Sequence, residues 1–329
     1  MKKFLRSIDF WDLLLAAACL AVFLYAAVFT PNFLSTFNLS QLAASASEKA
    51  LLILPMTLLI ITREIDLSIA SALALTSVIF GLLVQAGAPT LPAIGLTLVA
   101  GALLGAFNGY LTAGLGLQSL VVTLGTMALY RGIGYILLGT GSINILPPEI
   151  VDFGINNVPG TQIPWTIAPF LVLAPVFAIA LQKTGAGKRI YAIGGNPEVA
   201  RYSGVNTRRI VLSLFTISGV VAAIAGIVYT ARLSNARANN AFGMELDVIT
   251  IVLLGGVSVF GGKGRLTGVM LALALIAIIR NVLALNQIGG DAQGMIIGLL
   301  LIGSLLVGNY WRSLEERLSR SRALRETKG

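Results

Sequence analysis

The chain contains no histidine, a single cysteine and few charged residues, and each shortage excludes a class of function. Without histidine, it lacks the commonest metal ligand and the usual general base near neutral pH. The single cysteine, Cys19, lies in an apolar segment, so a disulfide framework is excluded. HExxH, CxxC and GxSxG motifs are also missing, and neither GK dipeptide is followed by the hydroxyl residue of a phosphate-binding loop. The sequence therefore predicts no enzymatic activity and no metal or cofactor in this chain.

Charged residues make up 11% of the sequence, against about 25% in soluble domains, and 56% of the residues are hydrophobic. A soluble globule does not need so much apolar surface, so the composition is typical of a multi-pass membrane protein. The net charge of +9 is confined to a few loops and the C-terminal tail, so we expect no nucleic-acid partner.

Apolar segments separated by short polar ones indicate an all-α integral membrane fold with about ten transmembrane helices. A membrane-spanning helix needs about 17–25 residues, and two of the ten segments, 246–261 and 295–310, are slightly short. Residues 1–310 are thus predicted to form the transmembrane domain, and 311–329 a basic cytoplasmic tail that touches lipid headgroups. The ten segments are 13–30, 41–62, 65–85, 91–113, 117–138, 165–182, 210–231, 246–261, 266–285 and 295–310.

The distribution of lysine and arginine predicts the orientation of the chain, because cytoplasmic loops carry an excess of these residues. With ten spans, both termini are cytoplasmic. Of the 23 lysines and arginines, two (Arg232 and Arg237) then lie outside, three lie within spans, and the remaining 18 lie inside. Five spans on either side of residues 155–164 would have opposite orientations, which predicts a 5+5 inverted repeat.

The longest polar interruption, residues 183–209, carries six cations and one anion, Glu198. A short helix is predicted within it at 197–203. Asn196 is a good N-cap, Pro197 suits the first helical position, and Gly204 suits the residue after the helix. So short a helix is only marginally stable alone. We therefore expect it to dock into a soluble partner and to transmit force to the membrane domain.

Polar side chains within or beside the apolar spans are candidates for a translocation path, because such groups are scarce and costly in a bilayer. Some fit a structural role equally well: Asp66 suits a helix cap, Glu245 and Asp247 suit an outer vestibule or a cap, and the asparagines suit helix packing. The candidates are Asp66, Ser68, Asn108, Arg131, Glu245, Asp247 and Asn281.

Two further expectations concern the charged groups. Arg131 must find an acceptor, which the sequence offers as helix-end carbonyls, Glu245 or Glu48, unless its side chain reaches the outer surface. Arg63 and Glu64 are expected to form a surface ion pair. No midplane carboxylate stands out as a carrier of protons or sodium, which argues against a secondary transporter and favours energy supplied by another subunit.

Four stretches of the sequence resemble the permease subunits of bacterial ATP-binding-cassette importers for monosaccharides, the family of the ribose, xylose, galactose, rhamnose and autoinducer-2 systems. One stretch departs from the family pattern: where the family has GGIDLSVGS, this chain has REIDLSIAS, with Arg63, Glu64 and Ala70 in place of glycines. The four stretches are MTLLIITREIDLSIAS from Met56, FNGYLTAGLGLQSLVVTLGTMALYRG from Phe107, YAIGGNPEVARYSGVN from Tyr191 and MELDVITIVLLGGVSVFGGKGRLTG from Met244.

The resemblance implies a permease of the bacterial cytoplasmic membrane that works as a homo- or heterodimer, with the path between the subunits. Two-domain ATPase subunits, which hold ATP and magnesium, would bind beneath, and an extracytoplasmic binding protein would deliver the solute, with rhamnose or autoinducer-2 favoured. The alternatives are a related importer for branched-chain amino acids or nucleosides, or a self-contained secondary carrier. The residues that match the family's coupling helix are Gly195, Asn196, Pro197, Glu198, Val199, Ala200, Arg201, Tyr202, Ser203 and Gly204.

Overall fold

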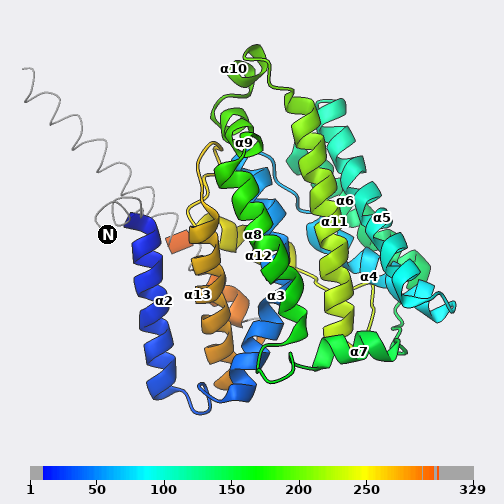
Figure 1. The fold of residues 1–329 in the computed structure, drawn as a ribbon, viewed down its shortest axis with the longest axis vertical. Helices are drawn as coiled ribbons and strands as arrows, with labels where there is room; N and C mark the ends of the chain where they lie inside the picture. The colour runs from blue at the N-terminus through cyan, green and yellow to red at the C-terminus, as the bar shows by residue number, and fades with distance from the viewer. Residues whose placement is uncertain (1–9, 291, 300–301, 304–329) are drawn as a thin grey trace, which may run out of the picture.

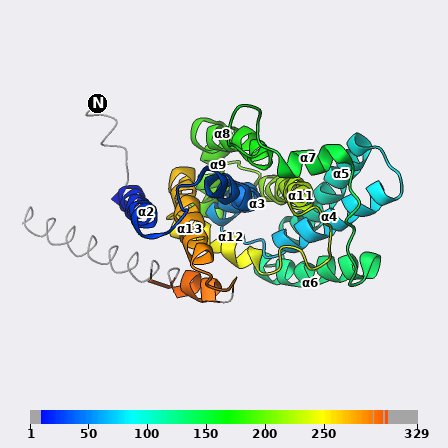
Figure 2. The ribbon, with the colours of Figure 1, turned by 90° about the horizontal axis from the view of Figure 1, so that it is seen from below.

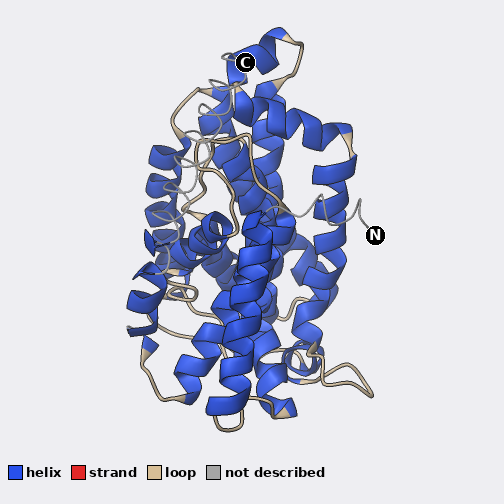
Figure 3. Ribbon diagram, turned by 90° about the vertical axis from the view of Figure 1, so that its left-hand side faces the viewer, coloured by secondary structure: helices blue, strands red, loops and turns tan. Residues whose placement is uncertain are grey.

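A computed structural model of the chain describes residues 10–290, 292–299 and 302–303. The predicted tail, 311–329, lies outside the described residues, as does most of the expected span 295–310. In the part that is described, the chain is a bundle of helices without strands, apart from two isolated β-bridges (Figure 3). Most helices run along the long axis of the molecule (Figure 1).

The helices follow the expected apolar segments, with two marked differences. The expected spans 65–85 and 246–261 contain only the short helices α4 and α12, and each begins after a non-helical link. The helices are α2 (Phe10–Phe29), α3 (Thr36–Ile61), α4 (Ile69–Gln85), α5 (Thr90–Gly109, extended by a π-turn at Tyr110–Gly114), α6 (Ser119–Leu138), α7 (Pro148–Ile155), α8 (Ala168–Lys183, after a 3₁₀ turn at Trp165–Ile167), α9 (Gly185–Gly195), α10 (Pro197–Tyr202), α11 (Thr207–Leu233), α12 (Met244–Leu254) and α13 (Leu266–Leu285).

Seven helices in the described ranges are long and apolar enough to cross a membrane: α2, α3, α5 with its π-turn, α6, α8, α11 and α13. The chain is therefore a multi-pass membrane protein. The total of ten spans, the orientation of the termini and the inverted repeat stay predictions.

The two longest helices, α3 and α11, lie in the middle of the bundle when it is viewed along its axis (Figure 2). Long apolar stretches of both are buried among the other helices, as expected for helices surrounded by protein. Glycines bring the backbones of α5 and α11 into direct contact. A Cβ atom added at Gly105 of α5 would lie 2.2 Å from the carbonyl oxygen of Phe215 on α11. A Cβ atom added at Gly219 of α11 would lie 2.0 Å from the carbonyl oxygen of Gly101 on α5. Such small-residue contacts are typical of membrane helix pairs.

The bundle has two distinct ends, which we name the α10 end and the α7 end after the helices that mark them in Figure 1. The α3–α4 link, residues 62–68, lies at the α10 end, where it contacts α9. The α11–α12 link, residues 234–243, starts at the α7 end, since Gly154 of α7 packs against the Ala231 carbonyl at the end of α11. The first link carries Arg63, Glu64, Asp66 and Ser68, and the second carries the backbone carbonyls that bind Arg131.

Candidate functional site

Helix α10 is the predicted coupling helix, and it ends one residue earlier than expected. Asn196 is confirmed as its N-cap: the side-chain oxygen accepts from the amides of Glu198 (3.0 Å) and Val199 (3.2 Å). Pro197 is the first helical residue, and Gly204 has a φ of +84°, the left-handed conformation that glycine adopts without strain. The local sequence thus determines both ends of this helix.

The outward face of α10 carries apolar side chains at the tip of the molecule. Val199 is 58% exposed and Tyr202 is 83% exposed, whereas Ala200 is buried against the body of the protein. The Arg201 guanidinium lies 5.8 Å from the centre of the Tyr202 ring. An exposed aromatic residue flanked by a cation is the kind of group that anchors protein interfaces.

Helix α10 is supported by α9, which lies within the polar interruption 183–209 and was not predicted as a helix. Glycine is a poor helix former, and four glycines in GAGKRIYAIGG hid this helix. The available signal was Thr184, whose hydroxyl accepts from the amides of Ala186 and Gly187 as an N-cap. The glycines are used for close packing instead: a Cβ at Gly187 would lie 1.8 Å from the Leu181 carbonyl oxygen.

The end of α9 is fixed to the end of α3 through Arg63. Its Nε donates to the Gly194 carbonyl (2.7 Å), and one terminal nitrogen donates to the Gly195 carbonyl (2.6 Å). A cation at the carbonyl end of a helix is favoured by the helix dipole. The Gly262 amide donates to the Ile61 carbonyl (2.9 Å), so the loop 255–264 joins the same junction. We call this contact of α3, α9 and loop 255–264 the glycine junction.

The expected surface pair of Arg63 with Glu64 is wrong, because the Arg63 side chain is used in the glycine junction. Arg63 also has a φ of +70°, a conformation that favours glycine. This accounts for the glycine that the resembled family carries here, and the two bonds to α9 offset the strain. Glu64 is half-buried in the same link, and burial raises the pKa of its carboxyl group.

Asp66, Ser68 and Asn108 come together in a buried polar network at the start of α4. Asp66 Oδ1 accepts from the Ser68 amide (3.1 Å) and hydroxyl (2.6 Å), and its Oδ2 accepts from the Ser218 hydroxyl on α11 (2.9 Å). Asn108 Nδ2 on α5 donates to Ser68 Oγ (2.7 Å), and the Tyr130 hydroxyl on α6 donates to Asn108 Oδ1 (3.2 Å). The network ties α4, α5, α6 and α11 together.

This network favours a structural role for three of the predicted path residues. Asp66 is only 3% exposed and Asn108 only 1%, so neither reaches an open surface in this conformation. Asp66 was expected to cap α4, but the N-cap residue of this helix is Ser68. Asp66 accepts from the backbone amide of Ser68 and not from the amides of the first helical turn.

Asp66→Ala should lower the free energy of unfolding by about 1–3 kcal/mol, because two buried hydroxyls lose their acceptor. Asp66→Asn should cost less, since its amide oxygen still accepts from Ser68. Thermal melting in detergent measures both variants, and an Asp66→Ala variant that melts like the unmodified chain would contradict this assignment.

Arg131 holds the α11–α12 link against α6. One terminal nitrogen donates to the carbonyls of Ala238 (3.0 Å) and Asn240 (2.6 Å), and the guanidinium lies 5.6 Å from the centre of the Phe242 ring. Its hydrogen-bond partners are thus carbonyls of the link, rather than the helix-end carbonyls or the carboxylates of Glu245 and Glu48 that the sequence offered. Glu245 acts on Arg131 electrostatically.

Charged side chains from four helices form a second cluster, inside the bundle. Lys49 Nζ lies 2.9 Å from Asp247 Oδ2, and an Arg280 terminal nitrogen lies 2.5 Å from Asp247 Oδ1. Next to Lys49, Glu48 is fully buried and receives a 2.6 Å bond from Arg232 Nε. Glu48 thus pairs with Arg232 rather than with Arg131, for which the sequence offered it as an acceptor.

The remaining candidate, Asn281, forms a reciprocal amide pair with Asn38. Its Nδ2 donates to Asn38 Oδ1 (2.8 Å), and Asn38 Nδ2 donates back to Asn281 Oδ1 (2.9 Å). The pair joins α13 to α3, so it has the packing role that the sequence offered as an alternative. Of the predicted path residues, Asp247 alone lies in the charged cluster.

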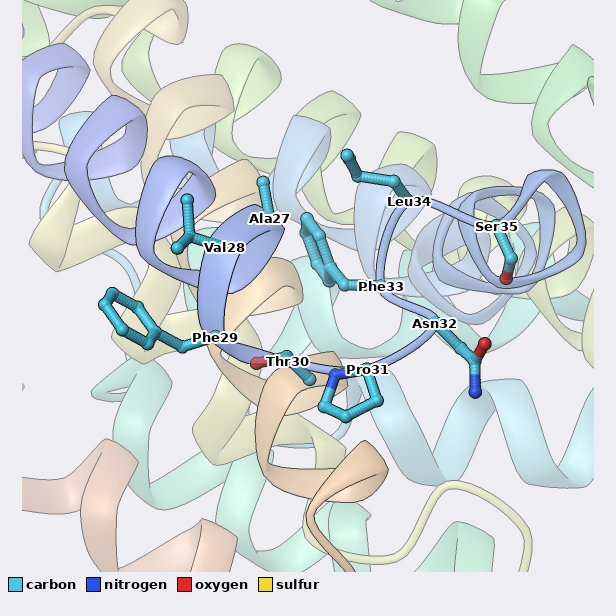
Figure 4. Close-up of a pocket in the computed structure, with 9 residues that line it drawn as sticks. All are labelled: Ala27, Val28, Phe29, Thr30, Pro31, Asn32, Phe33, Leu34 and Ser35. Atoms are coloured by element: carbon cyan, nitrogen blue, oxygen red, sulfur yellow. The ribbon is translucent and has the colours of Figure 1, made fainter.

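A pocket opens at the α2–α3 turn, at the opposite end of the molecule from α10 (Figures 1 and 4). Its wall is formed by residues 27–35, which include no charged side chain and none of the predicted site residues. Among the described residues, no group of three or more His, Cys, Asp or Glu side chains is placed to hold a metal ion.

The chain matches one protein-family model and several characterised proteins. The family model, described as "Branched-chain amino acid transport system / permease component", matches residues 38–305. The chain is 33% identical to the ribose import permease protein RbsC of Escherichia coli, over 89% of this chain and 92% of that protein. It is 34% identical to the autoinducer 2 import system permease protein LsrC of Salmonella choleraesuis, over 99% of this chain and 93% of that protein. No solved structure gives a significant match.

Proposed function

We propose that this chain, which belongs to the family of branched-chain amino acid transport system permease components, is the permease subunit of a sugar importer. The importer is of the ATP-binding-cassette class, and its solute is a monosaccharide or a similar small polyol. Support comes from the two relatives named above, which import ribose and autoinducer 2 and match nearly the whole chain. Their nearly equal identities do not distinguish autoinducer 2 or rhamnose from ribose.

The observation that carries the proposal is helix α10, a well-capped helix that presents Val199 and Tyr202 at one tip of the molecule. We place this end in the cytoplasm, where the helix docks onto a separate two-domain ATPase subunit. The ATPase holds the ATP and magnesium, so this chain needs no cofactor. A second permease subunit completes the path, and a binding protein docks at the α7 end.

The order of long and short helices supports the inverted repeat. In the first half a long central helix (α3) is followed by a link and a short helix (α4). In the second half α11 is followed by a link and the short helix α12. The two links begin at opposite ends of the bundle, as an inverted repeat requires, and short helices in matching positions mark the binding region in transporters built this way.

A branched-chain amino acid is the second candidate, because the family description names that solute class. A bound amino acid needs a cation for its carboxylate. In the described part of the bundle, each cation already contacts an oxygen acceptor: Lys49 and Arg280 share the carboxylate of Asp247, Arg232 binds Glu48, and Arg131 binds backbone carbonyls. This arrangement favours a neutral, hydroxyl-rich solute.

Transport by reconstituted vesicles tests the proposal. The chain, its ATPase subunit and its binding protein are inserted together, and uptake of labelled ribose, rhamnose and leucine is followed with ATP or with an ion gradient. We expect uptake of a sugar that requires both ATP and the ATPase. Uptake by the chain alone, driven by an ion gradient, would instead establish a secondary carrier, and ATP-driven uptake of leucine alone would establish the second candidate.

A further inference from the structure

Three charged side chains in the middle of the bundle are only partly covered by the protein. The side chains of Lys49, Asp247 and Arg280 are 15%, 19% and 27% exposed. The neighbouring Glu48, by contrast, is fully enclosed. We call Lys49, Asp247 and Arg280 the charged triad.

The charged triad lies at membrane depth. At 1.5 Å per residue, Lys49 is about 18 Å along α3 from its terminus at the α10 end, and Arg280 is about 21 Å along α13 from its start at the same end. The hydrocarbon core of a bilayer is about 30 Å thick. Both estimates therefore place the charged triad within the thickness of the hydrocarbon core.

Exposure at this depth cannot be exposure to lipid. A lysine, arginine or aspartate at the centre of a membrane helix costs about 2.5–3.5 kcal/mol even on the mildest scales. Ion pairing with Asp247 lowers that cost, but the donors that stay uncovered still need polar partners. The uncovered part of the charged triad must therefore face water or a polar solute.

The charged triad also has hydrogen-bonding capacity left over. Lys49 Nζ and a terminal nitrogen of Arg280 both bind Asp247, and the ammonium and guanidinium groups carry further N–H donors besides those used in these contacts. The three charges sum to +1, because the two cations share the one carboxylate of Asp247. A group with spare donors and one acceptor suits hydroxyl groups, which both accept and donate hydrogen bonds.

We infer that Lys49, Asp247 and Arg280 form one wall of a water-filled path and contact the hydroxyl groups of the solute as it crosses. This inference rests on the proposed function. The ammonium and guanidinium groups donate to hydroxyl oxygens, and Asp247 accepts from hydroxyl hydrogens. The Glu48–Arg232 pair, one residue along α3, fixes the rotation of that helix and so holds Lys49 toward the path.

Cysteine accessibility in the assembled transporter tests this inference. The native cysteine is removed by Cys19→Ser, and Ala277→Cys is introduced on α13, one turn from Arg280 on the same helix face. Val176→Cys, on an exposed position of α8, is the matched control for a lipid-facing residue. A charged, membrane-impermeant thiol reagent is compared with a membrane-soluble maleimide.

The charged reagent should modify Ala277→Cys and not Val176→Cys, and saturating sugar should slow the modification several-fold. Modification of Ala277→Cys by the soluble maleimide alone, or by neither reagent, would overturn the inference. ATP-driven uptake by the unmodified chain is measured in parallel. If uptake needs ATP while Ala277→Cys stays inaccessible to the charged reagent, the chain is still an importer subunit, but the charged triad does not line the solute path.

Transport by Lys49→Gln and Arg280→Gln gives an independent readout. Each variant keeps one cation beside Asp247, so the ion pair survives in part. We expect at least a tenfold loss of uptake, which appears mainly as a higher KM for the sugar, with little change in ATPase activity without sugar. An unchanged KM in both variants would overturn the assignment of the charged triad to the solute path.

Discussion

Removal of residues 197–203 should abolish solute import while the chain still inserts into the membrane and folds. Helix α10 is exposed at one tip of the molecule, and its N-cap bonds are local. Its loss therefore leaves the glycine junction and the core unaltered. Uptake by vesicles, together with the melting temperature in detergent, separates a loss of transport from a loss of folding.

Point variants sharpen this prediction. Tyr202→Ala removes an aromatic residue that is 83% exposed, and such interface anchors contribute about 2 kcal/mol or more to binding. We expect binding of the ATPase to weaken by at least about tenfold, since 1.4 kcal/mol corresponds to that factor.

Glu198→Arg should abolish import as well. Lys188→Ala, an exposed cation on α9, is the control and should import normally. Normal uptake without residues 197–203 would refute the coupling role.

Gly194→Ala should also abolish import, whereas Gly195→Ala should not. A Cβ atom at position 194 would lie 1.8 Å from the Ile61 carbonyl oxygen and 2.3 Å from the Gly262 amide nitrogen. Both are backbone atoms, so no side-chain movement relieves the clash, and α9 must move away from α3. A Cβ at position 195 meets nothing within 4 Å. These adjacent glycines in one helix form a matched pair.

Uptake and ATPase activity measured together show what the glycine junction does. We expect Gly194→Ala to lose at least about tenfold in uptake, while the ATPase still hydrolyses ATP when the subunits are assembled. Gly195→Ala should remain within about twofold of the unmodified chain, because the added methyl group meets no other atom within 4 Å. Equal uptake by the two variants would show that contact between α9 and α3 is not needed for transport.

Sequence reasoning succeeded where structure is determined locally. Both ends of α10 follow from Asn196, Pro197 and Gly204, because caps and turn glycines act over a few residues. The apolar segments gave the long helices to within a few residues for the same reason. Helix α9 was missed because glycine, which lowers helix propensity, is used there for close packing against α3 and α8.

The pairing of polar groups could not be predicted, because it depends on the three-dimensional packing of helices far apart in the sequence. Glu48 pairs with Arg232, and Lys49 with Asp247, across about 180 to 200 residues. No spacing rule connects such positions. A single sequence offers several acceptors for each cation, and only the fold selects among them.

The most direct test of the account is the location of residue 202 in the assembled importer. Tyr202→Cys in the Cys19→Ser chain is treated with a membrane-impermeant thiol reagent in inside-out and right-side-out vesicles, and with a short cross-linker in the presence of the ATPase. We expect labelling only in inside-out vesicles, protection of the cysteine by the ATPase, and a cross-link to that subunit. Labelling only in right-side-out vesicles, with no cross-link to the ATPase, would contradict the claim that this chain is driven through α10.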